Sequence, residues 1–230
     1  MKSLLGILFI LFGSHLCFSQ EDSLKVADEL YKEDQFYIGV TYNLLGSKPN
    51  GIKQSGFSTG FHFGIIKDIP LNKNRNIAIG VGLGYSLNSF NQNLLFNKDS
   101  SGSIVYSILS DNNTYNKNRF SSQSIELPIE FRWRTSTPTE YKFWRIYTGF
   151  KVGYELFDTA KYKGDLGYLK FRNTDDFNKF QYGLTLSAGY NTWNLYMYYG
   201  LTTVFSNKAK LEDNSIDMKA IKVGLMFYVL

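Results

Sequence analysis

Cysteine and histidine are almost missing from this sequence. Its 230 residues include one cysteine, Cys17, and two histidines, His15 and His62. Cys17 and His15 lie in an N-terminal stretch with the pattern of a secretory signal, so the mature chain has no cysteine and a single histidine. This excludes a disulfide framework and thiol chemistry, and it leaves no cluster of ligand-type residues at the spacing of a metal site. We therefore expect no metal and no cofactor.

A long hydrophobic run is also missing beyond the first twenty residues. No later segment approaches the roughly 18 apolar residues of a transmembrane helix. Hydropathy alone is a poor guide here, because membrane strands that alternate apolar and polar residues average to neutral. The net charge is +5, and no basic run or stripe of cations interleaved with aromatic residues indicates nucleic acid as a partner.

The sequence contains no recognisable catalytic arrangement. His62 has no nucleophile or carboxylate at a spacing that indicates a base beside a nucleophile. Glu126 and Glu130 share one face of a predicted strand, but the strand rise separates them by roughly 13 Å, which is too far for a direct acid/base pair. We therefore predict that the protein is not an enzyme.

Three segments differ in composition. Residues 1–19 have a positive start at Lys2, an apolar core and a small-residue end, and are predicted to be a signal peptide. Residues 20–35 are locally acidic and are expected to form a short periplasmic lead-in. Residues 36–230 are expected to form one barrel domain.

The strongest signal in the barrel region is a two-residue alternation between Ile77 and Asn88. One face carries large apolar side chains, whereas the other carries Ala78, Gly80, Gly82 and Gly84 followed by small polar residues. Successive strand side chains point to opposite faces. A nearly bare second face is expected where a strand lines the cramped interior of a narrow barrel.

The same alternation recurs along the chain and predicts eight strands. Each is close to the 9–11 residues that cross a bilayer at a tilt. Aromatic residues make up 17% of the chain, as expected of a barrel with rings at both membrane interfaces. The predicted strands are 36–44, 57–69, 77–88, 122–134, 143–156, 180–190, 193–205 and about 221–229.

The links between the predicted strands alternate in length. Short links follow the second, fourth and sixth strands, and longer polar links follow the others. An even strand count with this alternation predicts an all-β fold, an eight-stranded antiparallel transmembrane β-barrel with short periplasmic turns and longer extracellular loops. Within the longest loop, Ile104–Leu109 is apolar and strand-like, which predicts that the third and fourth strands extend above the membrane as a hairpin. Pro128 lies inside the fourth strand and predicts a bulge there.

Aromatic residues are sorted by strand end. Trp133, Trp144 and Trp193 have the apolar parity and flank short links, so we expect them to form an interfacial ring on the periplasmic side. Residues at the opposite strand ends are expected to form an outer ring. These are Tyr42, Tyr85, Tyr154 and Phe205.

Charged residues collect on the inward parity. An eight-stranded barrel is just wide enough for side chains to fill, so these charges must pair or meet water. We expect a salt-bridged plug, with a ligand or proton site and a conducting path as alternatives. The predicted interior charge cluster is Glu126, Glu130, Arg132, Arg134, Arg145, Lys151, Glu155 and Lys222.

Two sequence blocks resemble known outer-membrane proteins. The chain ends in KVGLMFYV at 222–229, similar to the terminal signal that the barrel-assembly machinery recognises during insertion. The block IELPIEFRWR at 125–134, continuing to KFWRIYTG at 142–149, resembles the PorT-like outer-membrane β-barrel family, and the resemblance extends over roughly residues 35–230. The resemblance implies a small barrel in a Gram-negative outer membrane, without a catalytic motif. One branch of this family is associated with type IX secretion.

We therefore expect an integral protein of the cell outer membrane, exported by its signal peptide, that is a structural or accessory component of an envelope or secretion assembly. Its expected partners are outer-membrane lipid, the barrel-assembly machinery and proteins of an envelope or secretion complex. A narrow pore or a small-solute-binding barrel is the alternative. A third hypothesis, a lipid-modifying or proteolytic enzyme, rests on analogy of fold alone.

Overall fold

The computed structural model describes residues 34–135 and 143–229, all within the compact unit Tyr31–Leu230. The predicted signal peptide and nearly all of the lead-in lie outside the described residues. Within the described part of the chain, no helix is both long and apolar enough to cross a membrane.

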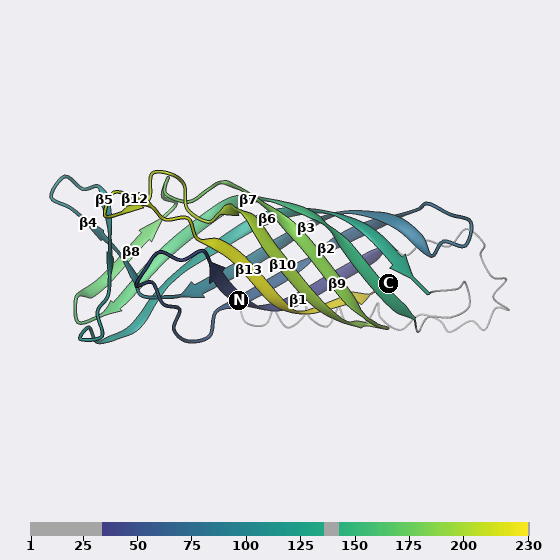
Figure 1. Ribbon diagram of the computed structural model, residues 1–230, viewed down its shortest axis with the longest axis horizontal. Coiled ribbons are helices and arrows are strands. Elements are labelled where there is room, and N and C mark those ends of the chain that lie inside the picture. Colours follow the sequence, from purple (N-terminus) through teal and green to yellow (C-terminus); the bar gives the residue numbers. More distant parts are fainter. Residues whose placement is uncertain (1–33, 136–142, 230) are drawn as a thin grey trace, which may run out of the picture. The chain divides into compact units, whose positions relative to one another are not determined.

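Eight antiparallel strands form a closed barrel (Figure 1). Their order in the sheet is β6-β3-β2-β1-β13-β10-β9-β7, and the pairing of β6 with β7 closes it. The predicted fold class is therefore confirmed. The barrel strands are β1 (Gln35–Gly46), β2 (Thr59–Pro70), β3 (Ile77–Asn91), β6 (Tyr115–Arg134), β7 (Trp144–Gly164), β9 (Phe180–Tyr190), β10 (Trp193–Thr203) and β13 (Lys219–Val229).

Each barrel strand alternates between exposed and buried residues. In β1, Phe36 and Ile38 are 63% and 57% exposed, whereas Tyr37 and Thr41 are both 2% exposed. The exposed residues are large and apolar and the buried ones are largely polar, the reverse of a soluble protein. This pattern suits a barrel surrounded by lipid, since the closed ladder leaves no backbone edge to satisfy.

Five shorter strands lie at the long-loop end of the barrel, where Figure 1 shows β4, β5, β8 and β12 gathered. As predicted, the third and fourth barrel strands, β3 and β6, extend beyond their membrane-spanning parts and stay paired up to Asn91 and Arg119. The longest loop between them contains a separate hairpin that was not predicted, β4 with β5. The hairpin β6–β7 is longer than expected, and β8 pairs along the extension of β7. The shorter strands are β4 (Leu94–Lys98), β5 (Ile104–Ile108), β8 (Gly167–Arg172), β11 (Lys210–Leu211) and β12 (Asn214–Ser215).

Phe205 does not belong to an outer aromatic ring, contrary to our prediction. It is 1% exposed and packs against Phe177, with ring centroids 4.8 Å apart, and against Phe120 at 5.3 Å. Phe96 of β4 joins this cluster at 6.0 Å from Phe205. We call this aromatic cluster at the long-loop end the cap. The apolar parity of Phe205 continues past the end of β10, where the chain turns inward over the barrel.

The predicted bulge at Pro128 is wrong. The pairing of β6 with β7 continues through Pro128 opposite Lys151 without a register change. On the other side, the pairs between β3 and β6 stop at Val81 and resume at Gly84 in the same register. The missing proline N–H therefore removes ladder contacts locally without inserting a residue.

The glycines of β3 make room for large interior side chains. A Cβ atom at Gly80 would lie 2.6 Å from Nε of Arg132, and one at Gly82 would lie 3.1 Å from Cγ of Pro128. At Gly84 it would overlap the hydroxyl of Tyr37, which comes from β1. The bare face of β3 therefore lies against a filled interior.

Candidate functional site

The first part of the interior network is a carboxylate held by two arginines near the short-turn end. Arg134 donates from both terminal nitrogens to Asp68, at 3.0 and 2.8 Å, in a bidentate pair. Arg132 donates to Oδ1 of the same carboxylate at 3.2 Å. All three side chains are completely or almost completely buried. A buried charge is tolerated only when it is paired and hydrogen-bonded, and this geometry meets both conditions.

Arg132 has further partners on its own strand and on β1. Its Nε donates to Glu130 at 3.2 Å, and Nη2 donates to Oε1 of Gln35 at 3.1 Å. The guanidinium also lies 4.5 Å from the ring centroid of Tyr147. Arg132 thus connects β1, β2, β6 and β7 across the interior. A planar five-donor group suits this position, whereas a lysine ammonium would not reproduce the fork.

The second part of the network is centred on Glu126. Its Oε2 accepts from Nζ of Lys151 at 2.8 Å, and its Oε1 lies 3.7 Å from Nζ of Lys222. Nδ1 of His62 lies 3.5 Å from Oε2. Lys151 also donates to the hydroxyl of Tyr196 at 2.8 Å. One carboxylate therefore faces two ammonium groups and an imidazole, all buried.

A third group of polar contacts lies toward the long-loop end. Glu155 accepts a hydrogen bond from Nε2 of Gln181 at 3.1 Å. Asp158 pairs with Lys179 at 3.3 Å and accepts from the backbone N–H of Thr174 at 2.9 Å. These contacts tie the end of β7 to the β8–β9 connection.

Arg145 is held differently from the other predicted charges. Its guanidinium lies 4.5 Å from the ring centroid of Phe143 and 5.8 Å from that of Tyr228. Its Nε and Nη1 have no hydrogen-bond partner among the described residues. Arg145 is only 4% exposed. Stacking on aromatic faces is therefore the main described interaction of this buried guanidinium.

The cap also contains a half-buried polar contact. The hydroxyl of Tyr106 on β5 donates to Oδ2 of Asp176 at 2.6 Å. Burial, followed by this hydrogen bond and the negative charge of Asp176, raises the pKa of Tyr106 above its ordinary value. Tyr106 therefore stays protonated and keeps the β4–β5 hairpin attached to the β8–β9 connection.

The structure places all eight predicted interior charges inside the barrel, each no more than 6% exposed. They do not form one cluster: Arg132 and Glu130 belong to the Asp68 group, Lys151 and Lys222 to the Glu126 group. The three tryptophans point outward, with exposures of 39% for Trp133, 60% for Trp144 and 63% for Trp193.

Sequence reasoning missed Asp68, the carboxylate that two arginines share. It also missed the tyrosines that fill the interior between the charges. Strand parity was the available signal, because Asp68 has the parity of His62 and Gly64 on β2. Its partners could not be found in that way, since they come from another strand. The missed residues include Asp68, Tyr37, Tyr196 and Tyr198.

The interior is filled in its middle section. Tyr37, Pro128, Lys151 and Tyr196 are among the side chains around a residual space there that is too small for a water molecule. Within residues 34–135 and 143–229, no group of three or more histidine, cysteine or acidic side chains is arranged to hold a metal ion. The arrangement is suited to holding eight strands in one register.

Residues 18–206 match the family described as outer membrane protein beta-barrel domain. The comparison with curated proteins found no match. Two solved structures of Ail, the attachment invasion locus protein of Yersinia pestis, are similar to this chain, one of them in complex with the heparin analogue sucrose octasulfate. Their sequence identities are 13% and 14%, and each alignment covers 86% of this chain and 99% of the other, with a TM-score of 0.36.

Proposed function

The chain belongs to the outer membrane protein beta-barrel domain family, and we propose that it is a non-enzymatic structural or accessory component of a larger envelope assembly. The observation that carries this proposal is the filled interior. Buried ion pairs centred on Asp68 and Glu126 occupy the barrel, and the residual space beside Glu130 and Lys151 is too small for water. A filled barrel offers its outer surface and its loops, rather than its lumen, for a biological role.

The extracellular loops support the same proposal. Five short strands and the aromatic cap form an ordered structure above the barrel, with Phe96, Phe120 and Phe205 buried at its centre. Ordering loops costs conformational entropy, which the burial of these rings offsets. A fixed loop structure presents a constant surface to partner proteins.

A secretion assembly is the first such partner to test. The block at 125–134 that resembles the PorT-like family supports this choice. The proposal also includes export by a signal peptide in residues 1–19. It further includes insertion by the barrel-assembly machinery, which would recognise the segment at 222–229.

Copurification tests the accessory role directly. An affinity tag placed behind the signal peptide would be used to recover the protein from membranes solubilised in a mild detergent. We expect envelope proteins to be recovered with it, and not with an equally tagged barrel of similar size. Recovery as a lone monomer, together with normal secretion and an intact envelope in a deletion strain, would contradict the proposal.

The alternative, a narrow pore, is tested by the interior itself. The charged residues motivate that alternative, but the ion pairs that join them across the interior oppose it. In planar bilayers we expect no unitary conductance from the purified protein. Reproducible unitary conductance steps at physiological salt would show that the interior is open, and the filled interior could then no longer support the proposed role.

A further inference from the structure

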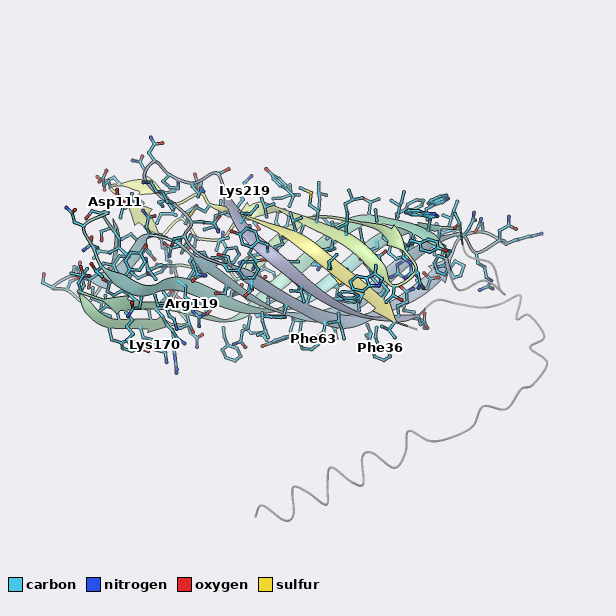
Figure 2. All side chains as sticks on the ribbon, turned by 90° about the horizontal axis from the view of Figure 1, so that it is seen from below. Phe36, Phe63, Asp111, Arg119, Lys170 and Lys219 are labelled. Carbon is cyan, nitrogen blue, oxygen red and sulfur yellow. The ribbon has the colours of Figure 1, made fainter. Side chains whose placement is uncertain are left out.

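Six cations share the outer face of the sheet where β6, β7 and β8 extend beyond the membrane-spanning part. On these strands the opposite parity is buried, as shown by Phe120 at 0% and Tyr162 at 2% exposure, so the six point away from the barrel axis. Figure 2 shows two of them, Arg119 and Lys170, at the loop end of the barrel. We call this set the basic face. It consists of Lys117, Arg119, Lys161, Lys163, Lys170 and Arg172.

The strand register sets these cations directly opposite one another. Lys117 pairs with Lys163, Arg119 with Lys161, and Lys161 also with Lys170 on its other side. Like charges in directly opposed positions destabilise a sheet. In the described part of the chain, no carboxylate forms an ion pair with any of the six. A concentrated charge of this kind attracts anions, and binding one would reduce its internal repulsion.

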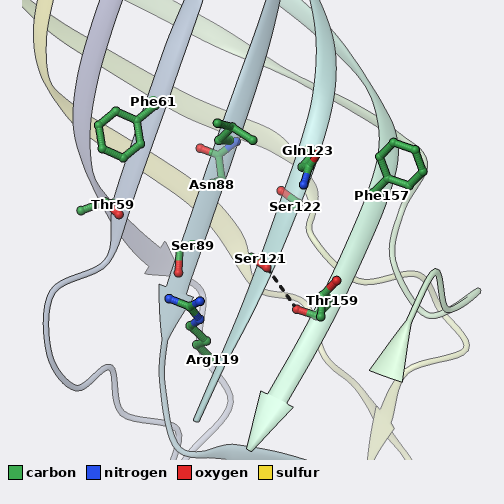
Figure 3. Close-up of a pocket in the computed structure, with 11 residues that line it drawn as sticks. Thr59, Phe61, Asn88, Ser89, Arg119, Ser121, Ser122, Gln123, Phe157 and Thr159 are labelled. Atoms are coloured by element: carbon green, nitrogen blue, oxygen red, sulfur yellow. Dashed lines mark hydrogen bonds between the residues drawn. The ribbon is translucent and has the colours of Figure 1, made fainter. Parts of the chain in front are cut away.

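A hollow of about 190 Å³ adjoins the basic face (Figure 3). Arg119, Ser89 and Ser121 line its loop-side part, and Ser121 donates to the carbonyl oxygen of Thr159 at 3.4 Å. Nε of Arg119 and the hydroxyl of Ser89 are buried, and neither has a hydrogen-bond partner among the described residues. Unused donors beside a cation are the groups that bind a phosphate.

The opposite side of the hollow is largely apolar. Phe61 and Phe157 line it and are 49% and 52% exposed, and Leu87 and the polar Gln123 lie between them on β3 and β6. These residues belong to the same outward parity as Phe63 and Ile125, which face the lipid. The hollow therefore lies at the upper border of the lipid-facing surface, with hydroxyl and guanidinium groups above and apolar side chains below.

From these observations we propose that the hollow and the basic face bind the phosphorylated saccharide headgroup of an outer-leaflet glycolipid. The phosphates interact with Arg119 and the neighbouring lysines, the sugar hydroxyls with Ser89 and Ser121, and an acyl chain packs along Phe61 and Phe157. A soluble polyanion would satisfy the cations but would leave the apolar side of the hollow exposed to water. The proposal does not depend on the accessory role, because it concerns the isolated barrel.

Native mass spectrometry of the protein extracted from outer membranes would test this site. The probe is bisphosphorylated lipid A, compared with the same glycolipid after removal of both phosphates. The variant combines Arg119→Gln, Lys161→Gln and Lys163→Gln. A matched control removes three exposed loop lysines outside the basic face, with Lys48→Gln, Lys98→Gln and Lys210→Gln. The shift of the folded band upon boiling, on a denaturing gel, shows that each variant forms a barrel.

We expect the triple variant to lose at least tenfold in affinity for lipid A, the control to match the wild type, and the phosphate-free glycolipid to bind the wild type at least tenfold more weakly. Equal affinities of the triple variant and the control would overturn the proposal. Equal binding of the phosphate-free glycolipid would overturn it too, because apolar contact alone would then explain association. Binding of a soluble heparin fragment that lipid A does not displace would assign the basic face to a soluble polyanion instead.

Discussion

Gly84 is predicted to tolerate no larger side chain, mainly because a Cβ atom there would overlap Tyr37 of β1. Replacing this glycine with alanine would bring the new Cβ into overlap with the hydroxyl of Tyr37 and to 2.9 Å from Cζ of that ring. Non-bonded heavy atoms in ordinary contact are about 3.5–4.0 Å apart, and the hydroxyl oxygen is the closest atom, so the ring must move by about 1.5 Å or more. Tyr37 is 2% exposed and packed among interior side chains, which limits its movement. Overpacking of this kind costs about 1–3 kcal/mol, and we expect Gly84→Ala to destabilise the barrel by that amount.

A double-mutant cycle makes this prediction specific. The hydroxyl of Tyr37 has no hydrogen-bond partner among the described residues, so Tyr37→Phe alone should change stability little. In the Gly84→Ala background the same change removes the overlapping atom and should restore about 1 kcal/mol. Gly153→Ala is the matched control, because its new Cβ would have no neighbour closer than 3.6 Å.

Stability would be measured by urea unfolding of the protein refolded into lipid vesicles, followed by tryptophan fluorescence. The reasoning is refuted if Gly84→Ala is as stable as Gly153→Ala. It is refuted equally if Tyr37→Phe gives no recovery in the Gly84→Ala background, because the contact would then not be the cause of the loss.

Three further predictions concern the interior, the cap and the membrane interface. Asp68→Asn removes the carboxylate shared by two buried arginines and should cost about 3–5 kcal/mol in urea unfolding, whereas Asp111→Asn in an exposed turn should cost less than about 0.5 kcal/mol; equal effects would contradict the assigned pairing. Because burial and Asp176 raise the pKa of Tyr106, its contribution to stability is complete below the unfolded-state pKa near 10 and is lost as the pH rises above that value. Limited proteolysis of the β4–β5 hairpin should accelerate between pH 8 and pH 10.5, roughly across that unfolded-state pKa, and this acceleration should be smaller in Tyr106→Phe; an unchanged pH dependence would exclude Tyr106 as its source. Lipids brominated near the headgroup should quench tryptophan fluorescence more strongly than lipids brominated at the chain end, since all three indoles point outward at one end of the barrel; the opposite order would contradict an interfacial ring.

The glycine alternation of β3 shows how much of the barrel a local pattern can predict. Strand side chains alternate with a period of two, so the sequence alone identified both faces of β3 and predicted a crowded interior beside the bare one. The local pattern could not identify the residues that fill this space. Tyr37 and Pro128 come from β1 and β6, and their meeting with β3 depends on the stagger between strands in the closed barrel.

For the charged residues of the interior, too, the sequence predicted the face of the strand but not the partner of each side chain. Parity alone placed Arg132 and Arg134 on the inward face, because the face of a residue is a local property of its strand. Their shared partner, Asp68, lies more than sixty positions earlier in the chain. Ion pairs across a barrel depend on its closure and register, so only the tertiary structure could identify them.

At the strand ends, local pattern was least informative. Phe205 has the apolar parity of β10, but it is buried in the cap because the chain bends inward there. The basic face is likewise invisible to parity alone, since its like charges come together only through the pairing of β6, β7 and β8. Alternation with a period of two thus determined the eight barrel strands and their faces, while contacts between distant strands, which depend on how the barrel closes, determined the interior pairs, the cap and the basic face.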